Sequence, residues 1–348
     1  MIALDERRLV EQTTELPLTH LASMSDHLGL FEHADHSTPR REHGYCLDDV
    51  ARGLMVVVGS KDDSATAADL LETYLRFSEA AIAFNGRAHN RLSRMGAWTD
   101  EQGLGDWWGR AIRALGVTAA SAVDPSVRQR ARVAFERAAR QRSPHLRAMA
   151  SAVIGAASVL AIDPRSETAR RLLIDGVAAI PESEDATWPW PEPRLRYGNG
   201  TIPHALLVAG AALGDRRLTE RGLAALSFLV LVQTRRGHLS VTGALGRGRG
   251  DDGPQFDQQP IEAGDIADAA ACAHRLGHGE RWADTVRMAW AWFLGDNDAG
   301  VAMIDPAVGA GFDGLQPAGR NRNRGAESTL AALSTSQHMR SLTDHRTL

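Results

Sequence analysis

Carboxylates occur beside aromatic, amide and arginine side chains in five stretches of the sequence. A glycosidic bond is cleaved when one carboxylic acid protonates the leaving oxygen and a second carboxylate activates water or attacks the anomeric carbon. Aromatic rings cover the apolar CH faces of a sugar, while amides, carboxylates and arginines bind its hydroxyls. A carbohydrate site is therefore indicated by REHGYCLDDVAR (41–52), GDWWGRA (105–111), WPWPEPRLRYGNG (188–200), DQQPIEAGD (257–265) and GFDGLQPAGRNRNRGAES (311–328).

Five of these carboxylates are candidates for the catalytic groups. Glu262 falls at the start of an apolar segment, where burial raises the pKa of a carboxyl towards that of a general acid. Glu192 lies between two prolines, which stiffen the chain and hold a side chain in place. The further candidates are Asp49, Asp106 and Glu327. Two such groups about 5 Å apart would retain the anomeric configuration, and roughly 6.5 to 9.5 Å would invert it. We expect an inverting glycoside hydrolase.

The same carboxylates also have a purely structural interpretation. An aspartate at the start of a helix is often its N-cap, and a glutamate in the first turn is stabilised by the helix dipole. Glu192 could likewise be an ordinary loop carboxylate paired with Arg194 or Arg196. A functional role is favoured because several carboxylates occur beside aromatic rings, which a helix cap does not require.

The five stretches also contain residues expected to bind the sugar through their rings or polar groups. They are Arg41, His43, Asp48, Arg52, Trp107, Trp108, Trp190, Tyr197, Asn199, Gln258, Gln259 and Asp313. We expect no cofactor and no metal ion, since the sequence contains neither an HExxH motif nor paired CxxC motifs. Cys272 and His274 are two positions apart on an expected helix and therefore face different ways.

The overall composition excludes several other classes of protein. The 348 residues carry a formal net charge of -4, which provides no basic surface for nucleic acid or an anionic membrane. Lys61 is the single lysine, and its GSKDDS context fits neither a P-loop, a kinase nor an enzyme that forms a Schiff base. Two cysteines form no disulfide framework, and the N-terminal segment is charged where a signal peptide is apolar. No apolar run reaches the roughly 20 residues of a transmembrane helix, so we expect a cytoplasmic protein.

The spacing of apolar residues predicts an all-α protein. Apolar residues recur at helical intervals, alanine is abundant, and alternating β-branched runs are nearly absent. Some segments are apolar on most sides, as is typical of helices that are buried all round. These segments begin near residues 48, 106, 146, 202, 261 and 326, a repeat of roughly 40 to 65 residues.

Helices with one charged face alternate with these buried helices. The sequence predicts them over residues 65–83, 125–141, 166–180, 216–234 and 280–295, with a sixth, N-terminal helix over 5–28. The pattern fits two concentric rings of six helices, an (α/α)6 toroid. An open solenoid would need polar capping repeats at its ends, whereas both terminal segments of this sequence have apolar faces. We expect one domain over residues 1–348, with the N-terminal helix completing the outer ring and a frayed tail at 340–348. A homodimer remains an option.

Long irregular segments precede five of the buried helices. They cover residues 31–46, 84–107, 181–201, 235–260 and 296–325. Loops of this length are uncommon in compact domains unless they have a function. In a toroid the loops that lead into the inner helices gather at one mouth, so we expect the candidate residues to face a common cavity.

Several motifs together resemble those of a bacterial family of α/α-toroid proteins in the six-hairpin glycosidase superfamily. They are REHGYCLDDVAR, the GRA after Asp106, WPWPE with Tyr197 and Asn199, DQQPIEA, FLGDND and DGLQPAGRNRNRGAEST, between about residues 30 and 338. The resemblance implies a toroid fold and a carbohydrate-linked role, since such proteins are often encoded beside glycosyltransferases and mannoside phosphorylases. Glu192, Glu262 and Glu327 match the family pattern, whereas two tryptophans before the GRA stand in place of a serine and a histidine.

Three other functions are open on the sequence alone. A non-catalytic glycan-binding partner of a glycosyltransferase would use the same residues without turnover. A sugar epimerase or isomerase on a similar toroid would need histidines as acid and base, for which His43 and His204 are the candidates. A glycoside phosphorylase would differ in its attacking group, and Arg41 or Arg52 could then hold the phosphate.

Overall fold

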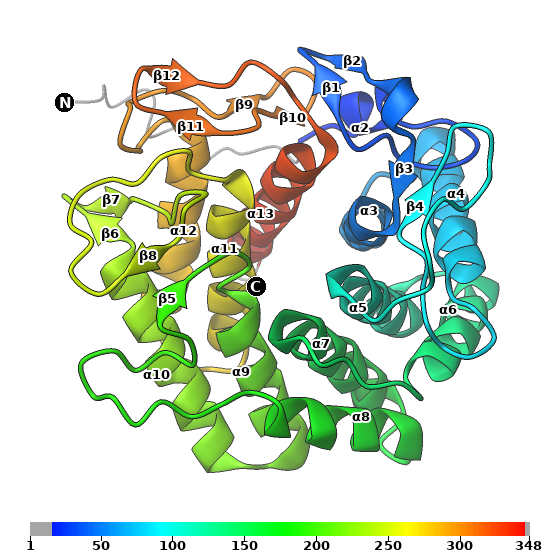
Figure 1. Cartoon of the computed structure of the whole chain (residues 1–348), viewed down its shortest axis with the longest axis horizontal. Coiled ribbons are helices and arrows are strands. Elements are labelled where there is room, and N and C mark those ends of the chain that lie inside the picture. The colour runs from blue at the N-terminus through cyan, green and yellow to red at the C-terminus, as the bar shows by residue number, and fades with distance from the viewer. Residues whose placement is uncertain (1–15, 345–348) are drawn as a thin grey trace.

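A computed structural model describes residues 16–344 and contains the inner ring of helices that the sequence predicts. The ring consists of α3 (Leu47–Gly59), α5 (Asp106–Ser121), α7 (Leu146–Ile162), α9 (Thr201–Leu213), α11 (Pro260–Arg275) and α13 (Ala326–Asp344). Each of these helices packs against the next, and α13 packs against α3, so the ring closes (Figure 1). All begin within one residue of the expected positions, which confirms the predicted (α/α)6 architecture.

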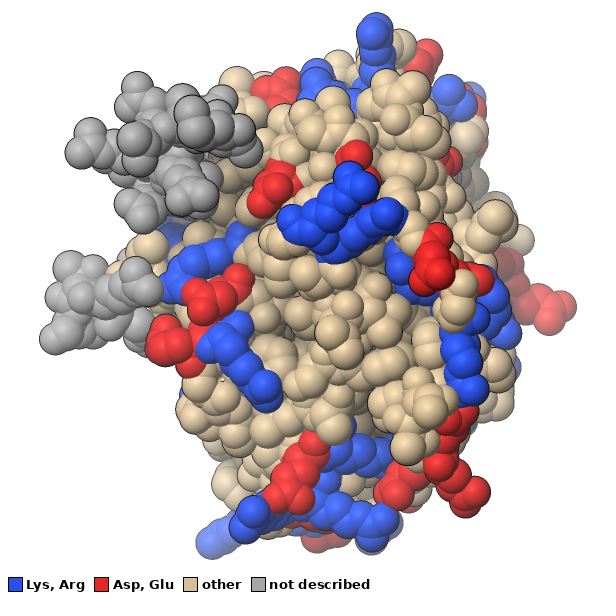
Figure 2. Space-filling view, turned by 90° about the vertical axis from the view of Figure 1, so that its left-hand side faces the viewer, with Lys and Arg blue, Asp and Glu red and all other residues tan. Residues whose placement is uncertain are grey.

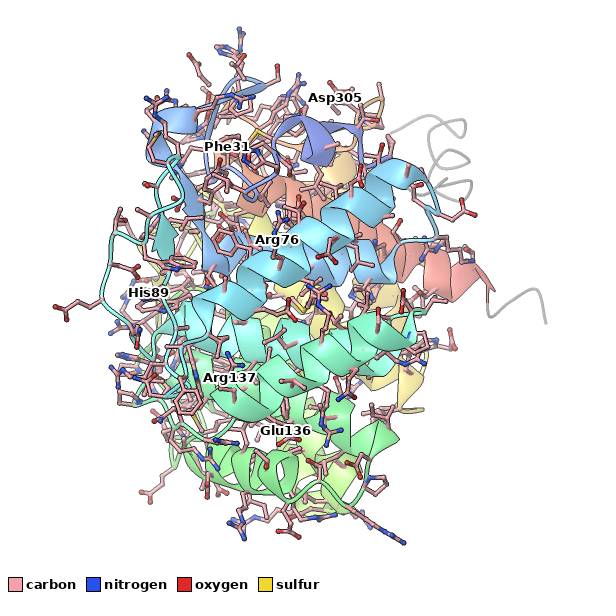
Figure 3. The ribbon with its side chains drawn as sticks, turned by 90° about the vertical axis from the view of Figure 1, so that its right-hand side faces the viewer. Phe31, Arg76, His89, Glu136, Arg137 and Asp305 are labelled. Atoms are coloured by element: carbon pink, nitrogen blue, oxygen red, sulfur yellow. The ribbon has the colours of Figure 1, made fainter. Side chains whose placement is uncertain are left out.

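A second layer of helices surrounds this ring. It contains α4 (Ala65–Ala81), α6 (Pro125–Ala138), α8 (Glu167–Ala178), α10 (Arg216–Val232) and α12 (Arg281–Leu294). Each packs against the inner helix that precedes it in the chain. Figure 3 shows α4 and α6 side by side on the outside of the ring, with Glu136 and Arg137 on α6. These helices have one charged face because one side contacts the inner ring and the other faces solvent.

Glycines allow the inner helices α5 and α7 to approach closely. A Cβ atom on Gly116 would lie 2.3 Å from the carbonyl oxygen of Gly155, and a Cβ atom on Gly155 would lie 2.3 Å from that of Ile112. Gly109, one turn after the start of α5, would meet the carbonyl oxygen of Ala148 at 2.2 Å. Any larger side chain would push the two backbones apart, so these glycines fix the spacing of the ring.

Short antiparallel strand pairs give the long loops a fixed path, which the sequence did not predict. The pairs are β1 (Ala34–Asp35) with β2 (Thr38–Pro39), β3 (Tyr45–Cys46) with β4 (Arg91–Leu92), β5 (Arg194–Leu195) with β8 (Arg247–Gly248), β6 (Thr234–Arg235) with β7 (His238–Leu239), β9 (Ile304–Asp305) with β10 (Ala310–Gly311), and β11 (Leu315–Gln316) with β12 (Gly319–Arg320). Two of the pairs join different loops: β3 with β4 connects the loops before α3 and α5, and β5 with β8 connects those before α9 and α11. Loops from separate hairpins are thereby held together at one end of the ring.

The two ends of the chain differ from the prediction. Of the helix expected over residues 5–28, residues 1–15 lie outside the described residues, and only α2 (Thr19–Ser23) is helical in the remainder. Over residues 340–344, the first part of the expected frayed tail, α13 continues and the side chain of Leu342 is buried. Residues 345–348 lie outside the described part of the chain.

The outer surface bears on the two predictions about partners. No helix in the described residues is long and apolar enough to cross a membrane. The side of the molecule that carries α10 has a largely uncharged area in its middle, between groups of charged side chains (Figure 2). Homodimer formation stays a prediction.

Candidate active site

A cavity of about 610 Å³ opens where the inner helices begin. Its lining comes from α3, α5, α11 and α13, together with the loops that lead into α9 and α11. Five of the residues singled out in the sequence line it, namely Arg52, Tyr197, Gln259, Glu262 and Glu327. The structure therefore brings together side chains that are separated by up to 275 positions in the sequence.

Glu262 lies in the first turn of α11 and is only 2% exposed. Its Oε1 accepts a hydrogen bond of 2.5 Å from the backbone N–H of Gly198, and its Oε2 accepts one of 2.7 Å from Nδ2 of Asn199. Burial raises the pKa of the Glu262 carboxyl to about 7, the nearby Asp265 adds to this effect, and the hydrogen bonds oppose it. The burial that the sequence predicts for this carboxyl is confirmed.

The loop that holds Glu262 depends on two glycines. Gly198 has a φ of +59°, a backbone conformation that side chains with a Cβ rarely adopt. A Cβ atom on Gly200 would lie 2.2 Å from the carbonyl oxygen of Asp265, so only glycine allows the loop to contact α11 here. Asn199, predicted to bind sugar, is fully buried between these glycines and instead orients Glu262.

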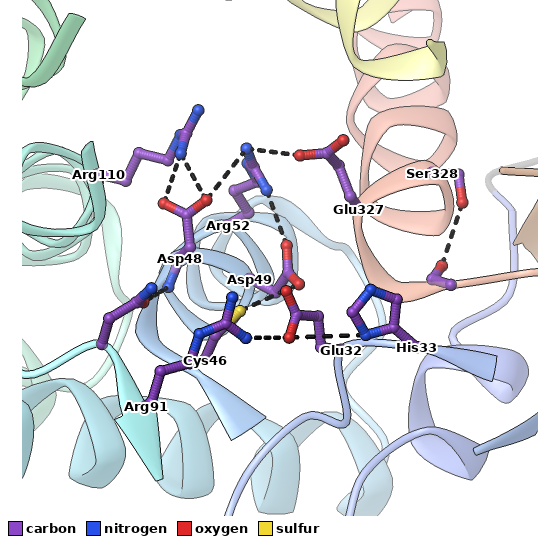
Figure 4. A network of polar contacts seen from close by, with 12 residues as sticks. Glu32, His33, Cys46, Asp48, Asp49, Arg52, Arg91, Arg110, Glu327 and Ser328 are labelled. Atoms are coloured by element: carbon purple, nitrogen blue, oxygen red, sulfur yellow. Dashed lines mark hydrogen bonds and ion pairs between the residues drawn. The ribbon is translucent and has the colours of Figure 1, made fainter. Parts of the chain in front are cut away.

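Arg52 is the centre of a second cluster of charges at the floor of the cavity (Figure 4). Its Nη1 donates to Oδ1 of Asp49 at 2.7 Å, and its Nη2 lies 2.9 Å from Oε2 of Glu327. Oδ2 of Asp48 lies 3.5 Å from the same Nη2 atom. Arg52 thereby links α3 to α13 and keeps the Glu327 carboxylate, whose side chain is 42% exposed, at the cavity.

Asp49 is buried behind Arg52. Burial raises the pKa of Asp49 to about 7 even though Arg52 opposes this shift. The thiol of Cys46 donates to Oδ2 of Asp49 at 3.2 Å, and burial raises the pKa of that thiol well above its usual value. Glu32, Cys46 and Asp49 form a group with metal-binding side chains within 4.8 Å of one another, but Arg91 contacts Glu32 and Arg52 contacts Asp49. A cation there would have to displace two arginines.

Asp48 pairs with Arg110 of α5 across the floor of the cavity. Nη1 of Arg110 lies 2.5 Å from both carboxylate oxygens of Asp48. Burial disfavours the charged form of Asp48, but Arg110 and Arg52 outweigh it and lower the pKa below its usual value. Neither Asp48 nor Asp49 is an N-cap, because the N-cap of α3 is Cys46.

Tyr197 lines the cavity, and Asp106 at the start of α5 acts on its hydroxyl. Burial, together with the nearby Asp106, raises the pKa of Tyr197 to about 12. The guanidinium of Arg147 lies 4.6 Å from the centre of the same ring. Asp106 thus contacts a cavity residue without lining the cavity itself, and the N-cap of its helix is Gly105.

Glu192 does not line the cavity. Both of its carboxylate oxygens accept hydrogen bonds from Arg147 of α7, at 3.0 and 2.7 Å. The sequence offered Arg194 or Arg196 as partners, but the distance from Nε of Arg196 to Oε1 of Glu192 is 3.9 Å. The structural interpretation therefore applies to Glu192, with a partner 45 positions away in the sequence.

The tryptophans expected to cover a sugar pack inside the protein. Trp108 is fully buried and donates to the carbonyl oxygen of Gly86, and Trp107 donates to that of Ala88. Trp190 is 2% exposed and packs against Phe228 with ring centroids 6.2 Å apart. Aromatic residues beside carboxylates fit a sugar site and a loop core equally well, and only the side-chain directions distinguish the two.

The four remaining predicted binding residues lie away from the cavity. Gln258 is buried and donates to Asp298, and Asp313 accepts from the backbone N–H of Gly325 and the hydroxyl of Ser328 at the start of α13. The other two lie near one another in the chain: Arg41 stacks over Phe31, and the ring of His43 contacts that of His33. All four order the loops of the mouth.

Three arginines that line the cavity were not among the predicted site residues: Arg110, Arg194 and Arg196. Arg194 and Arg196 had been considered only as ion-pair partners of Glu192, and Arg110 only as part of the GDWWGRA motif. The backbone of the loop over residues 242–246 was not predicted either, because the loop contains no charged side chain and gives no signal in the sequence.

The two histidines considered as acid and base lie outside the cavity lining. His204 is buried, and desolvation lowers its pKa well below the usual value. Beside it, Asp268 accepts hydrogen bonds from Arg113 at 2.5 Å and from His338 at 2.6 Å when the latter is protonated on Nε2. Arg113 holds the pKa of Asp268 far below its usual value, although burial opposes this. These groups bind the inner helices α5, α11 and α13 to one another.

Solved structures of an epimerase, a mannanase and a cellulase share this architecture. Cellobiose 2-epimerase from Bacillus thermoamylovorans has a TM-score of 0.70 at 10% identity, over 97% of this chain and 98% of that one. An α-1,6-mannanase from Salegentibacter has a TM-score of 0.64 at 14% identity, over 97% and 98%. A cellulase of C. cellulolyticium in complex with cellobiose has a TM-score of 0.61 at 8% identity, over 90% and 88%. The chain has the six-hairpin glycosidase fold.

The six-hairpin fold alone does not select an activity, because these three proteins differ in the reaction that their names state. Neither a protein-family model nor a curated protein matches the chain. The activity depends on the side chains that line the cavity.

Proposed function

We propose that this protein is a glycoside hydrolase that acts on the end of an oligosaccharide or polysaccharide in the cavity. The observation that carries the proposal is the set of titratable groups at the cavity: its described lining contains Glu262 and Glu327 but no histidine and no lysine. Glycoside hydrolysis requires two carboxyl groups in different protonation states. The different surroundings of these two glutamates favour such a division.

Glu262 takes the role of general acid in this proposal. Its raised pKa keeps the carboxyl protonated up to about pH 7, so that it can donate to the leaving oxygen. The donors of Gly198 and Asn199 fix its orientation and stabilise the carboxylate that forms when the proton leaves.

Glu327 takes the role of the base that activates water. Arg52 contacts its carboxylate at 2.9 Å, and the 42% exposure of the side chain leaves room for a water molecule beside it. Attack by water rather than by the carboxylate itself inverts the anomeric centre. The proposed reaction is therefore inverting.

Asp48 and Asp49 act as positioning residues. Both contact Arg52, which in turn contacts Glu327. An inactive variant of a Salegentibacter α-1,6-mannanase with this fold replaces two consecutive aspartates by alanine. Asp48 and Asp49 are likewise consecutive aspartates at the start of an inner helix. This similarity supports the proposal that the activity of this chain depends on both of them.

Hydrolysis is favoured over epimerisation by the positions of the histidines. Epimerisation needs a group that removes a proton from carbon, a role for which the sequence suggested His43 and His204. His204 is buried with a strongly lowered pKa, and His43 contacts His33 outside the cavity lining. The carboxyls of the cavity are the better match to acid and base catalysis on a glycosidic oxygen.

The test is a reducing-sugar assay over a panel of oligosaccharides and polysaccharides. We expect release of sugar by the wild type, and a loss of kcat of about 10²-fold or more in both Glu262→Gln and Glu327→Gln. Glu192→Gln is the matched control, because it changes a carboxylate of the same mouth that lies outside the cavity lining. Proton NMR of the first anomer formed tests inversion.

Other outcomes would overturn the proposal. Turnover that requires inorganic phosphate would indicate a phosphorylase, and deuterium uptake from solvent into a free sugar would indicate an epimerase. Tight glycan binding without turnover would indicate a non-catalytic partner of another enzyme. Full activity of Glu262→Gln would remove the assigned acid.

A further inference from the structure

Arginines outnumber the carboxyl groups in the cavity lining. Of the described lining residues, four are arginines and two are glutamates. Two of the arginines, Arg52 and Arg194, are bonded to carboxylates of the protein: Arg52 to Asp49 and Glu327, and Arg194 to Asp251 at 2.8 Å. Their hydrogen bonds serve the protein itself. Arg110 is also bonded to a carboxylate, that of Asp48, but through one nitrogen only, and Arg196 lies 3.9 Å from Glu192, beyond hydrogen-bond distance.

Arg110 uses only part of its hydrogen-bonding capacity. A guanidinium has five N–H donors in a planar fork. Within the described residues, both hydrogen bonds recorded for Arg110 leave from Nη1 and end on Asp48. Figure 4 shows its second terminal nitrogen pointing away from Asp48. Since Arg110 lines the cavity, an edge of the fork is available to a molecule bound there.

Arg196 is the second arginine with available donors. Its side chain is 67% exposed at the rim of the cavity. Its contact with Glu192 is 3.9 Å long, which is beyond hydrogen-bond distance, and both oxygens of Glu192 are already bonded to Arg147. The charge of Arg196 is therefore only partly offset by Glu192, a carboxylate that it shares with Arg147.

Tyr197 is placed beside these two arginines. It follows Arg196 in the chain, and it lines the cavity together with Arg110. Its ring is half exposed and can cover the apolar face of a sugar. One apolar surface and two partly unpaired guanidinium groups are thus available at one wall of the cavity.

We propose that Arg110 and Arg196 bind an oxyanion on the substrate, a carboxylate or a phosphate group carried by the sugar. Planar guanidinium groups bind both kinds of oxyanion through paired charge-assisted hydrogen bonds. A neutral sugar would not supply these remaining donors with the charge-assisted partner that an oxyanion offers. The inference rests on the proposed function, because that function places a sugar in the cavity. It narrows the substrate class to acidic or phosphorylated glycans.

The inference is tested by calorimetry on the full chain without turnover. The probes are hexuronates and hexose 1-phosphates, each measured beside its neutral parent hexose, together with inorganic phosphate. We expect at least one anionic sugar to bind about tenfold or more tightly than its neutral parent, with an affinity that falls as salt is added.

Two variants locate the binding group. Arg196→Gln removes the charge at the rim, and Arg110→Lys keeps a charge for Asp48 while it removes the planar fork. We expect each variant to weaken binding of the anionic sugar about tenfold and to leave binding of the neutral sugar within about twofold. Arg216→Gln, a change on the exposed outer helix α10, is the control and is expected to bind as the wild type does.

The possible outcomes separate this inference from the proposed hydrolysis. Equal binding of every anionic sugar and its neutral parent, or wild-type affinity in both variants, would overturn the inference even if a neutral glycan is hydrolysed. Binding of inorganic phosphate as tight as that of the sugars would overturn the assignment of the oxyanion to the substrate. Selective binding of an anionic sugar without any hydrolysis would support the inference and overturn the proposed function. Thermal unfolding of Arg110→Lys serves as the check that this variant is folded.

Discussion

The protonation of Glu262 links the stability of the protein to its proposed activity. Burial raises the pKa of this carboxyl to about 7 in the folded protein, against a reference value of 4.5. The folded state therefore keeps a proton that the unfolded state releases as the pH rises above 4.5. The free energy of unfolding is highest below pH 4.5 and falls until about pH 7, above which both states are ionised. The pKa difference corresponds to a loss of about 3 kcal/mol.

Glu262→Gln removes this ionisable group and its contribution to the pH dependence. We expect the free energy of unfolding of the variant, relative to that of the wild type, to rise by about 2 to 3 kcal/mol between pH 5 and pH 8. Urea unfolding at the two pH values measures the change. Glu220→Gln on the exposed outer helix is the control, for which we expect a difference below about 0.5 kcal/mol.

The same proton must appear in the kinetics if Glu262 is the general acid. Above about pH 7 we expect kcat/KM to fall about tenfold per pH unit, because the acid is lost from the free enzyme. Asp49 also has a pKa raised to about 7, so Asp49→Asn is needed to assign the alkaline limb. The limb should persist in Asp49→Asn. The reasoning is refuted if Glu262→Gln keeps the wild-type pH profile, or if its stability shows the pH dependence of the wild type.

Four further substitutions test the packing around the site, each by chemical denaturation. Glu192→Gln should lower the free energy of unfolding by about 1 to 3 kcal/mol and leave kcat within about threefold, and a large loss of kcat would restore Glu192 as a catalytic candidate. Gly116→Ala should cost about 2 kcal/mol or more because its Cβ would clash with backbone, whereas Gly264→Ala, with 3.3 Å to its nearest neighbour, should cost clearly less. Asp268→Asn should cost about 3 to 5 kcal/mol by leaving Arg113 unpaired, and a neutral effect would contradict the proposed role of this pair in closing the ring.

The inner ring could be predicted from the sequence because helix periodicity is a local property. Segments that are apolar on all sides must be buried on all sides, and their alternation with amphipathic helices permits few arrangements. The starts of the inner helices therefore agree with the prediction to within one residue. The local composition of the loops, by contrast, gave no sign of the strand pairs β3 with β4 and β5 with β8, because their partners come from different loops.

The site was predictable only where a residue's surroundings are set by its own helix. Glu262 begins an apolar inner helix, so its burial and raised pKa follow from the sequence. Glu192 looked equally suitable, but Arg147, on another helix, binds both of its oxygens. Trp108 lies in a motif beside polar residues, yet its ring turns into the core and not towards the cavity.

The helices, their two layers and the end of the ring at which polar side chains collect follow from the amino-acid sequence. Which of those side chains share the cavity, and which arginine is paired with which carboxylate, follows from the packing of the helices and loops. The reason is that periodicity fixes the face of an element on which a residue lies. The partner it meets depends on how distant elements pack, as with Arg52 and Glu327, which come from opposite ends of the chain.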